Sequence, residues 1–348
     1  MLDPDLLIAI YAPQSMGTLN AKMAEGVLRY GRNRAVAVID PAAAGQRVRD
    51  LCPIDSDVPI VATLNEAVAL GARVLVLGTA PSGGRLPQDW IATLSSALAA
   101  GLSIVNGLHD RLNDRFGAAL KPGQFIWDVR VPQGEKPSIA MGRAAAMTNT
   151  RVLMVGTDMA IGKMTAALEV HHWLVQAGHD AAFLATGQTG IVISGAGIPL
   201  DAVPVDYAAA MVERMVLEAA AHDIVLIEGQ GSLLHRGSTA TLPLMRGSCA
   251  NRLVLCHRAG MDRLDTSDSV VLVPPLDEVI ALNEMVACAA GALTPAKVVA
   301  LSLNTRDLDE RAARREIDRL SDWLGLPVGD PVRFGAGPIA QAVLAVET

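Results

Sequence analysis

A glycine-rich segment between a buried strand and a helix places the strongest constraint on how this chain can fold. Apolar residues 152–155 lead into the sequence GTDMAIGKMT, residues 156–165, and a helix-forming stretch follows. Glycines allow the backbone angles that turn amide N–H groups inward, and the helix N-terminus adds partial positive charge. This order predicts a phosphate-binding loop, or P-loop, after a strand of a parallel α/β sheet.

Within this loop, Lys163 is predicted to place a point charge on the outer phosphates, and the Thr165 hydroxyl can hold Mg²⁺. The loop departs from the usual GxxxxGK[ST] motif in two ways. One additional residue separates Gly156 from Gly162, and Met164 stands where a hydroxyl residue usually follows the lysine. Later in the chain, Asn304 follows an apolar strand and can read a base edge or cap a turn. The predicted cofactor-binding residues are Gly156, Thr157, Asp158, Gly162, Lys163, Met164, Thr165 and Asn304.

Apolar strand-like runs alternate with helix-like stretches along nearly the whole chain, which is typical of parallel sheets. The predicted strands are 6–12, 35–40, 58–64, 73–80, 102–108, 152–155, 180–187, 223–231, 251–260, 269–275 and 297–305. Residues 125–132 look less regular, and the Pro-rich, polar residues 131–138 indicate a linker. We therefore predict a Rossmann-like, doubly wound α/β domain over 1–135 and a P-loop NTPase-like parallel α/β domain over 148–348.

Composition excludes several classes of protein. The net charge is −7 and only 3% of residues are aromatic, with no basic stripe, which disfavours nucleic-acid binding. No apolar run reaches the length of a membrane span, and the N-terminus carries acidic residues where a signal peptide has basic ones. Four cysteines without close pairing favour reduced thiols and no metal site, so a cytoplasmic protein is expected.

Two residues near one strand end are candidates for acid–base chemistry. Glu228 ends an apolar strand and is followed by Gly229 and Gly231, and His235 lies a few residues further on. A carboxylate in that position can hold Mg²⁺ or accept a proton, and an unperturbed imidazole titrates near ~6.5. The predicted catalytic residues are therefore Lys163 with Glu228 or His235, and the choice between the last two stays open.

Residues 185–206 read as a long polar, glycine-rich loop, of the kind that often faces a ligand. In it, Gln188 and Thr189 are predicted to orient an amino-acid substrate, and Asp206 to attract its ammonium group. Arg258, near another strand end, can clamp a carboxylate. Local turns in the loop and a solvated arginine are the alternative interpretations.

The GTDMAIGKMT loop resembles that of dethiobiotin synthetases, which implies an ATP- and Mg²⁺-dependent enzyme. A closer resemblance covers nearly the whole chain, through GRLPQDW, GLHDRL, IWDVR, ATGQTGI, EGQGSLLH, LCHRAG, LNTR and DPVRFGAGP as well as the loop. On these segments the chain resembles a bacterial and archaeal P-loop family long known only as a domain of unknown function. One branch of that family consists of D-glutamate N-acetyltransferases of D-glutamate catabolism. The first domain also resembles the CoA-binding domains of acyl-CoA synthetases.

The branch resemblance implies acetyl-CoA as donor and D-glutamate as acceptor, with CoA phosphates on the P-loop. An ATP-dependent kinase or ligase acting on a small carboxylate is the alternative, because the same loop suits both ligands. A nucleotide-sensing scaffold is a third hypothesis, and the retained Gly162-Lys163 pair argues against it. We expect the partners to be a small amino-acid substrate and further copies of this chain.

Overall fold

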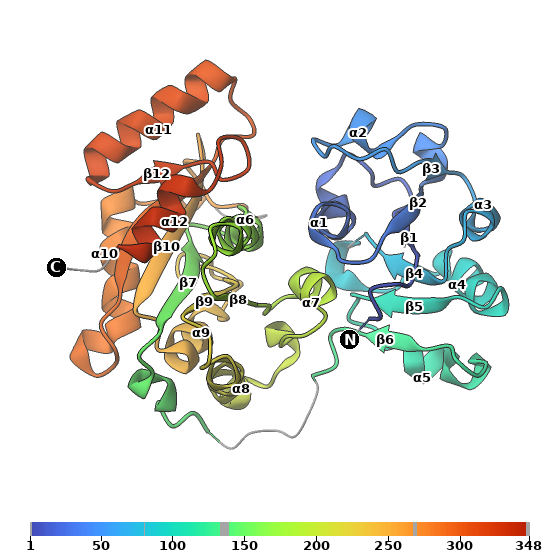
Figure 1. The fold of residues 1–348 in the computed structure, drawn as a ribbon, viewed down its shortest axis with the longest axis horizontal. Coiled ribbons are helices and arrows are strands. Elements are labelled where there is room, and N and C mark those ends of the chain that lie inside the picture. The colour runs from blue at the N-terminus through green and yellow to red at the C-terminus, as the bar shows by residue number, and fades with distance from the viewer. Residues whose placement is uncertain (1, 80, 133–138, 267–269, 346–348) are drawn as a thin grey trace. The chain divides into compact units, whose positions relative to one another are not determined.

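In a computed structural model of the chain, the described residues are 2–79, 81–132, 139–266 and 270–345 (Figure 1). The chain divides into two compact units. The N-terminal unit comprises Met1–Gln133 with Gln188–Ala202, and the C-terminal unit comprises Gly134–Gly187 with Val203–Thr348. Most of the linker expected at 131–138 lies outside the described residues.

The N-terminal unit is built on a six-stranded parallel sheet in the order β3-β2-β1-β4-β5-β6. This is the strand order of a Rossmann fold, with its topological switch between β1 and β4, and it confirms the predicted fold class. The strands are β1 (Ile8–Tyr11), β2 (Ala35–Ile39), β3 (Ile60–Val61), β4 (Val74–Leu77), β5 (Ser103–Asn106) and β6 (Ile126–Asp128). The helices are α1 (Lys22–Tyr30), α2 (Val48–Leu51), α3 (Leu64–Ala69), α4 (Trp90–Ala99), α5 (Leu112–Phe116) and α7 (Gln188–Ser194).

Helix α4 shows why these segments become helices that cover the sheet. Trp90, Leu94 and Ala97 recur at helical spacing, and all three are buried. The Trp90 ring meets Tyr11 of β1 edge-on, with the ring centroids 5.0 Å apart. The apolar face of the helix is thereby fixed on the centre of the sheet.

Two parts of this unit differ from the sequence-based expectation. Residues 125–132, expected to be irregular, contain the edge strand β6. Residues 185–206, expected to form a loop, contain α7, and this helix packs against α1 within the N-terminal unit. Polar and glycine residues hid the helix, whose Ile191, Val192 and Ile193 are buried.

The C-terminal unit has a second parallel sheet in the order β12-β11-β10-β7-β9-β8. Its strands are β7 (Thr150–Gly156), β8 (Ala181–Leu184), β9 (Ile224–Ile227), β10 (Arg252–Arg258), β11 (Lys297–Asn304) and β12 (Val328–Gly329). Its helices are α6 (Lys163–Gln176), α8 (Val205–Glu218), α9 (Thr241–Ser248), α10 (Leu276–Cys288), α11 (Glu310–Leu324) and α12 (Gly337–Leu344).

The predicted strand over 269–275 is wrong. Its described residues form no sheet strand, and Leu272 makes only an isolated bridge with Arg263. Val270 and Leu272 are exposed, so their apolar character does not reflect burial in a sheet. The short edge strand β12 takes the place beside β11 instead.

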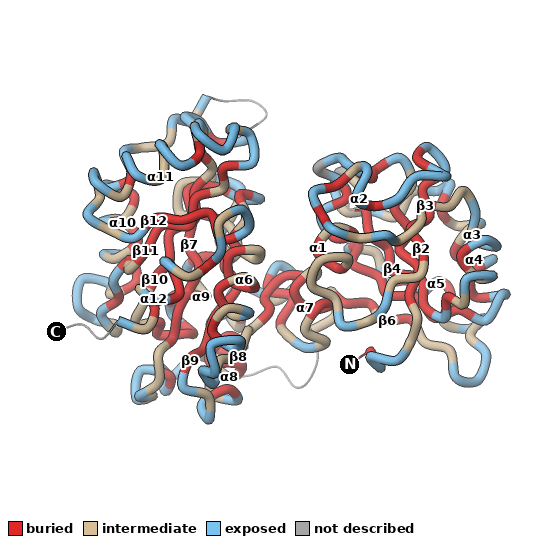
Figure 2. Tube along the Cα trace, turned by 45° about the horizontal axis from the view of Figure 1, so that its top comes forward, coloured by how far each residue is buried: buried red, intermediate tan, exposed pale blue. Residues whose placement is uncertain are grey.

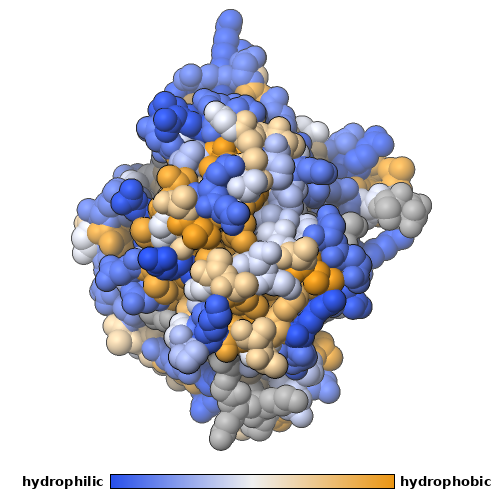
Figure 3. All heavy atoms as spheres, turned by 90° about the vertical axis from the view of Figure 1, so that its right-hand side faces the viewer, coloured by the Kyte–Doolittle hydropathy of each residue, from blue (hydrophilic) through white to orange (hydrophobic). Residues whose placement is uncertain are grey.

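The inner strands of both sheets are buried while the helices alternate between buried and exposed positions (Figure 2). On the face shown in Figure 3, apolar side chains gather toward the centre among hydrophilic ones, a mixture that is ordinary for a folded surface. No helix in the described part of the chain combines the length and apolar character needed to cross a membrane.

The buried Asp128 carboxylate of the edge strand β6 joins this strand to β5 and to the start of α5, and its removal is a test of its contribution to stability. Asp128 accepts hydrogen bonds from the Asn106 amide (2.7 Å), the backbone N–H groups of Leu112 and Asn113 (2.9 and 3.0 Å), and the Asn113 side chain (2.9 Å). Asp128→Ala leaves several buried donors without an acceptor, so we expect a loss of about 3 kcal/mol in the free energy of unfolding. Urea unfolding measures this loss. The exposed Asp114→Ala on α5 is the control and should change stability by less than about 0.5 kcal/mol; equal stability of both variants would contradict the prediction.

Candidate phosphate-binding site

The P-loop leaves β7 at Gly156 and enters α6 at Lys163, as the sequence predicts. Ala160 and Gly162 take left-handed backbone angles, with φ of 56° and 116°. Within the described residues, no acceptor is found for the backbone N–H groups of residues 160–165. These donors sit at the start of a 14-residue helix, where the helix dipole also favours an anion. The loop is therefore built to bind phosphate oxygens.

Two glycines let the strand ends approach one another at this site. A Cβ on Gly156 would lie 2.8 Å from Ile161 Cδ1, and a Cβ on Gly229 would lie 2.8 Å from Lys163 Cδ and collide with the Met154 carbonyl. A larger residue at position 229 would collide with the backbone of β7, whereas one at position 156 would require the Ile161 side chain to move.

Lys163 is almost fully buried, and its ammonium group donates to the Asp158 carbonyl at 2.6 Å. Burial lowers the pKa of Lys163 to about 8, against the opposing effects of Cys256, Asp158 and Glu228. A buried cation with one backbone acceptor gains strongly from an anionic ligand.

Glu228 is buried at the end of β9 and faces the same loop. Its Oε2 accepts from the backbone N–H groups of Thr186 (2.7 Å) and Gly187 (3.0 Å), just after β8. Burial raises the pKa of Glu228 to about 7, although these two bonds and Lys163 act in the opposite direction. A carboxylate with a pKa near neutrality can both accept and release a proton.

The remaining P-loop residues brace the loop. Asp158 accepts from the Met159 and Asp265 backbone N–H groups at 2.7 and 2.8 Å. The Thr157 hydroxyl pairs with His257 Nδ1 at 3.0 Å, and burial lowers the pKa of His257 to about 4. Thr157 and Asp158 are thus fully buried supports of the loop, whereas Met164 and Thr165 are half-buried in the first turn of α6.

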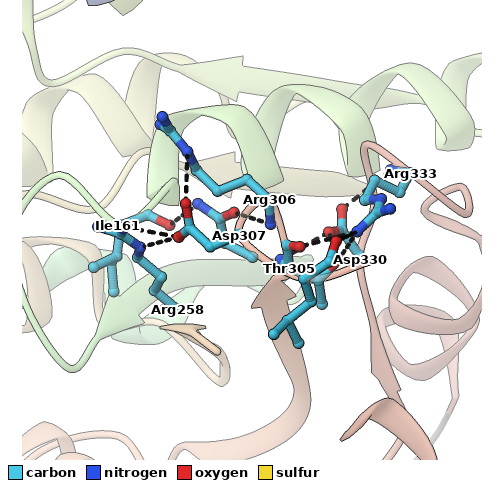
Figure 4. A network of polar contacts seen from close by, with 9 residues as sticks. Ile161, Arg258, Thr305, Arg306, Asp307, Asp330 and Arg333 are labelled. Carbon is cyan, nitrogen blue, oxygen red and sulfur yellow. Dashed lines mark hydrogen bonds and ion pairs between the residues drawn. The ribbon is translucent and has the colours of Figure 1, made fainter. Parts of the chain in front are cut away.

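Asn304 joins the P-loop to the loop that follows β11 (Figure 4). Its amide donates to the Ile161 carbonyl at 3.2 Å and its oxygen accepts from the Arg306 N–H at 3.1 Å. In the same network, Arg258 pairs with Asp307 at 2.7 Å. The amide of Asn304 is thus held by two backbone groups, and Arg258 is held by an acidic neighbour.

The two candidate bases have different surroundings. His235 Nδ1 accepts from the Gly237 N–H at 3.0 Å, and Nε2 lies 3.3 Å from the Asp265 carbonyl. Both ring nitrogens are therefore engaged. Among the described residues, Glu228 Oε1 has one hydrogen-bond partner, the Gln230 amide at 3.4 Å, so the geometry favours Glu228 as the base.

The predicted substrate residues are divided between the two units. Gln188 and Thr189 begin α7, in the N-terminal unit, whereas Asp206 is exposed in the first turn of α8 and Arg258 ends β10, both in the C-terminal unit. Their roles stay predictions. Among the described residues, no group of three His, Cys, Asp or Glu side chains comes together as a metal site.

Sequence reasoning missed Thr186, Gly187, His257 and Asp265, which contact the predicted residues. Thr186 and Gly187 act through their backbone N–H groups, which leave little trace in a sequence. Their only signal was the position at the carboxyl end of the predicted strand 180–187.

The buried lysine predicts a pH-dependent affinity. Because the pKa of Lys163 is lowered to about 8, the free protein loses this charge above that pH and must take up a proton to bind a phosphate. We expect the affinity for acetyl-CoA or ATP to fall as pH rises through about 8. Lys163→Met should lower the affinity about 10- to 150-fold at pH 7 and remove this pH dependence. Calorimetric titration with each ligand, from about pH 6.5 to about pH 9.5, measures both the affinity and its pH dependence.

The matched control for this experiment is Lys121→Met, because Lys121 is an exposed lysine in the N-terminal unit. It should retain both the affinity and the pH dependence. Unchanged binding of both ligands by folded Lys163→Met protein would contradict the assignment of this loop as the phosphate-binding site.

Comparison with known proteins agrees with this organisation. Residues 138–340 match the family described as "Domain of unknown function (DUF1611_C) P-loop domain", and residues 41–132 match "Domain of unknown function (DUF1611_N) Rossmann-like domain". The crystal structure of a DUF1611 family protein from Anabaena variabilis superposes with a TM-score of 0.94 at 46% identity, covering 98% of this chain and 99% of that one.

Two curated relatives carry a named activity. A D-glutamate N-acetyltransferase from Tritonibacter scottomollicae is 39% identical over 291 residues, which cover 82% of this chain and 85% of that protein. A D-glutamate N-acetyltransferase from a Pseudoalteromonas species is 35% identical over 284 residues, or 79% and 82% of the two chains. The sequence matches, the Rossmann-like strand order and the P-loop geometry lead to one conclusion: the chain belongs to the DUF1611 family.

Proposed function

We propose that this protein is an N-acetyltransferase that moves the acetyl group of acetyl-CoA to the amine of D-glutamate. The names of the two relatives support this activity. The observation that carries the proposal is the buried Glu228 carboxyl, with a pKa of about 7, at the strand end beside the P-loop. A phosphate site alone suits many ligands, whereas a neutral-range base beside it suits attack by an amine.

The residues of the loop fit the phosphates of CoA. The N–H groups of residues 160–165 are donors without acceptors in the described part of the chain, and Lys163 adds a buried positive charge. Together they can hold a pyrophosphate. Acetyl-CoA, when bound, supplies the acetyl thioester that the reaction consumes.

Glu228 would accept the proton that the attacking amine must lose. A C–N bond to the acetyl carbon forms, the C–S bond breaks, and the sulfur leaves as the CoA thiol after taking up a proton. Backbone N–H groups of residues 229–231, which have no acceptor among the described residues, can stabilise negative charge that develops on the acetyl oxygen. The Thr186 and Gly187 amides keep the Glu228 side chain oriented during proton transfer.

The donor experiment separates this proposal from the ATP-dependent alternative. With acetyl-CoA and D-glutamate, purified protein should release free thiol and form N-acetyl-D-glutamate, identified by mass spectrometry. L-glutamate should react much more slowly, because the wrong enantiomer leaves polar groups of a chiral site unpaired. ATP should not be needed, and EDTA should change the rate little. Carboxylate-dependent release of ADP or AMP, with acetyl-CoA untouched, would instead establish a kinase or ligase.

The proton-transfer role predicts a specific pH profile. Glu228 is protonated below a pKa of about 7 and cannot then accept a proton, so kcat should fall as pH drops through about 7. Glu228→Gln should lower kcat by about 10²–10⁴-fold and leave the dissociation constant of acetyl-CoA nearly unchanged. The control is His235→Ala, which should keep kcat within about tenfold of the wild type because both ring nitrogens already have partners. The opposite ranking of the two variants would move the base to His235.

A further inference from the structure

A cavity of ≈ 700 Å³ opens on the C-terminal unit, beside the carboxyl ends of β10 and β11. Gly260 and Leu308 contribute from the loops after these strands, and one face of α11 contributes the remaining wall. That wall consists of Ala312, Arg315, Glu316, Asp318 and Arg319. The volume is within the range of small-molecule sites, about 300–1,000 Å³.

The cavity combines an apolar floor with charges that are not all neutralised. Leu308 and Ala312 provide apolar surface, and an added Cβ on Gly260 would meet no atom within 4 Å. Arg319 is committed to Glu316 by two bonds of 2.8 and 2.7 Å. By contrast, the described residues provide no ion-pair partner for Arg315 or Asp318. A ligand with a flat apolar ring, a donor group and an anion would suit this lining.

The cavity is tied to the P-loop by the loops that form it. The Asn304 amide donates to the Ile161 carbonyl of the P-loop, and the chain continues from Asn304 to Leu308, which lines the cavity. The Arg258–Asp307 ion pair joins the ends of β10 and β11 in the same network. The cavity and the P-loop are thus connected through Asn304 and the loop that follows it.

The strand order arranges the cavity, the P-loop and Glu228 in sequence along the carboxyl ends of the strands. In the order β11, β10, β7, β9, the cavity lies at the first two strands, the P-loop at the third and Glu228 at the fourth. The strand β10, which precedes the cavity residue Gly260, pairs directly with β7, the strand that leads into the P-loop. The covalent order of CoA is the same, since its 3′-phosphoadenosine precedes the pyrophosphate and the pyrophosphate precedes the arm that ends in the thioester.

We infer that this cavity binds the 3′-phosphoadenosine end of CoA and that Arg315 recognises the 3′-phosphate. The inference rests on the proposed function, because it assigns one end of the proposed donor. In this arrangement the adenine ring lies on the apolar floor, and Asp318 accepts hydrogen bonds from its amino group or from the ribose. Arg315 then separates CoA from nucleotides that lack a 3′-phosphate, such as ATP.

The experiment compares CoA with 3′-dephospho-CoA, which lacks only the recognised phosphate. Wild-type protein should bind CoA at least about tenfold more tightly in calorimetric titration. Arg315→Met should weaken CoA binding about 10- to 100-fold, leave 3′-dephospho-CoA within about twofold, and so abolish the preference. Arg315→Lys, which retains the charge, should restore part of the preference.

Arg311→Met is the matched control, because Arg311 is an exposed arginine on the same helix. Its side chain does not line the cavity. It should retain the wild-type preference. If Arg315→Met weakens both ligands equally, or neither, the inference is wrong while the proposed function stands. If wild-type protein binds neither form of CoA, both are wrong.

Discussion

Two oppositely charged groups, Lys163 and Glu228, are buried at the carboxyl ends of neighbouring strands in one parallel sheet, and the rest of the site depends on this placement. Burial shifts both pKa values toward neutrality, to about 8 for the lysine and about 7 for the glutamate. A buried charge must be satisfied by hydrogen bonds or by a partner charge. The protein meets this requirement with backbone groups, namely the Asp158 carbonyl for Lys163 and the Thr186 and Gly187 amides for Glu228. Both charged groups can therefore respond to a ligand without the disruption of an existing side-chain ion pair.

Parallel strands make this arrangement possible. The carboxyl ends of β7, β8, β9 and β10 meet at the same edge, so segments distant in sequence supply the P-loop, the base and its supports. Gly229 permits the close approach, since any Cβ there would collide with β7 and with the Lys163 side chain. Three hydrogen bonds hold the loop in place. Asp158 accepts from the Asp265 N–H, and Thr157 pairs with His257 of β10. Asn304 of β11 donates to the Ile161 carbonyl. These hydrogen bonds fix the position of the loop, and preorganisation of this kind reduces the entropy lost when a ligand binds.

The chain also connects the base to the N-terminal unit by a short route. Gly187 donates to Glu228, and the next residue, Gln188, begins α7, which packs against α1 of the N-terminal unit. One peptide bond therefore separates Gly187, whose N–H hydrogen bond lowers the pKa of Glu228, from the first residue of a helix in the N-terminal unit.

The sequence by itself determined the fold class and the P-loop, because both arise from local order. Alternating apolar strands and helices predict parallel sheets, and a strand, a glycine-rich turn and a lysine at a helix start predict an anion site. Local patterns failed where long-range packing decided the outcome. The described residues 270–275 are mostly apolar without becoming a strand. The polar-looking segment 188–194 is a helix because its isoleucines and valine are buried in the N-terminal unit. Likewise, Glu228 and His235 were equal candidates in sequence, and only the tertiary structure distinguished them. It buries Glu228 behind the backbone N–H groups of Thr186 and Gly187, just after β8, and it engages both ring nitrogens of His235. The pKa and the hydrogen bonding of a side chain depend on such neighbours rather than on sequence position.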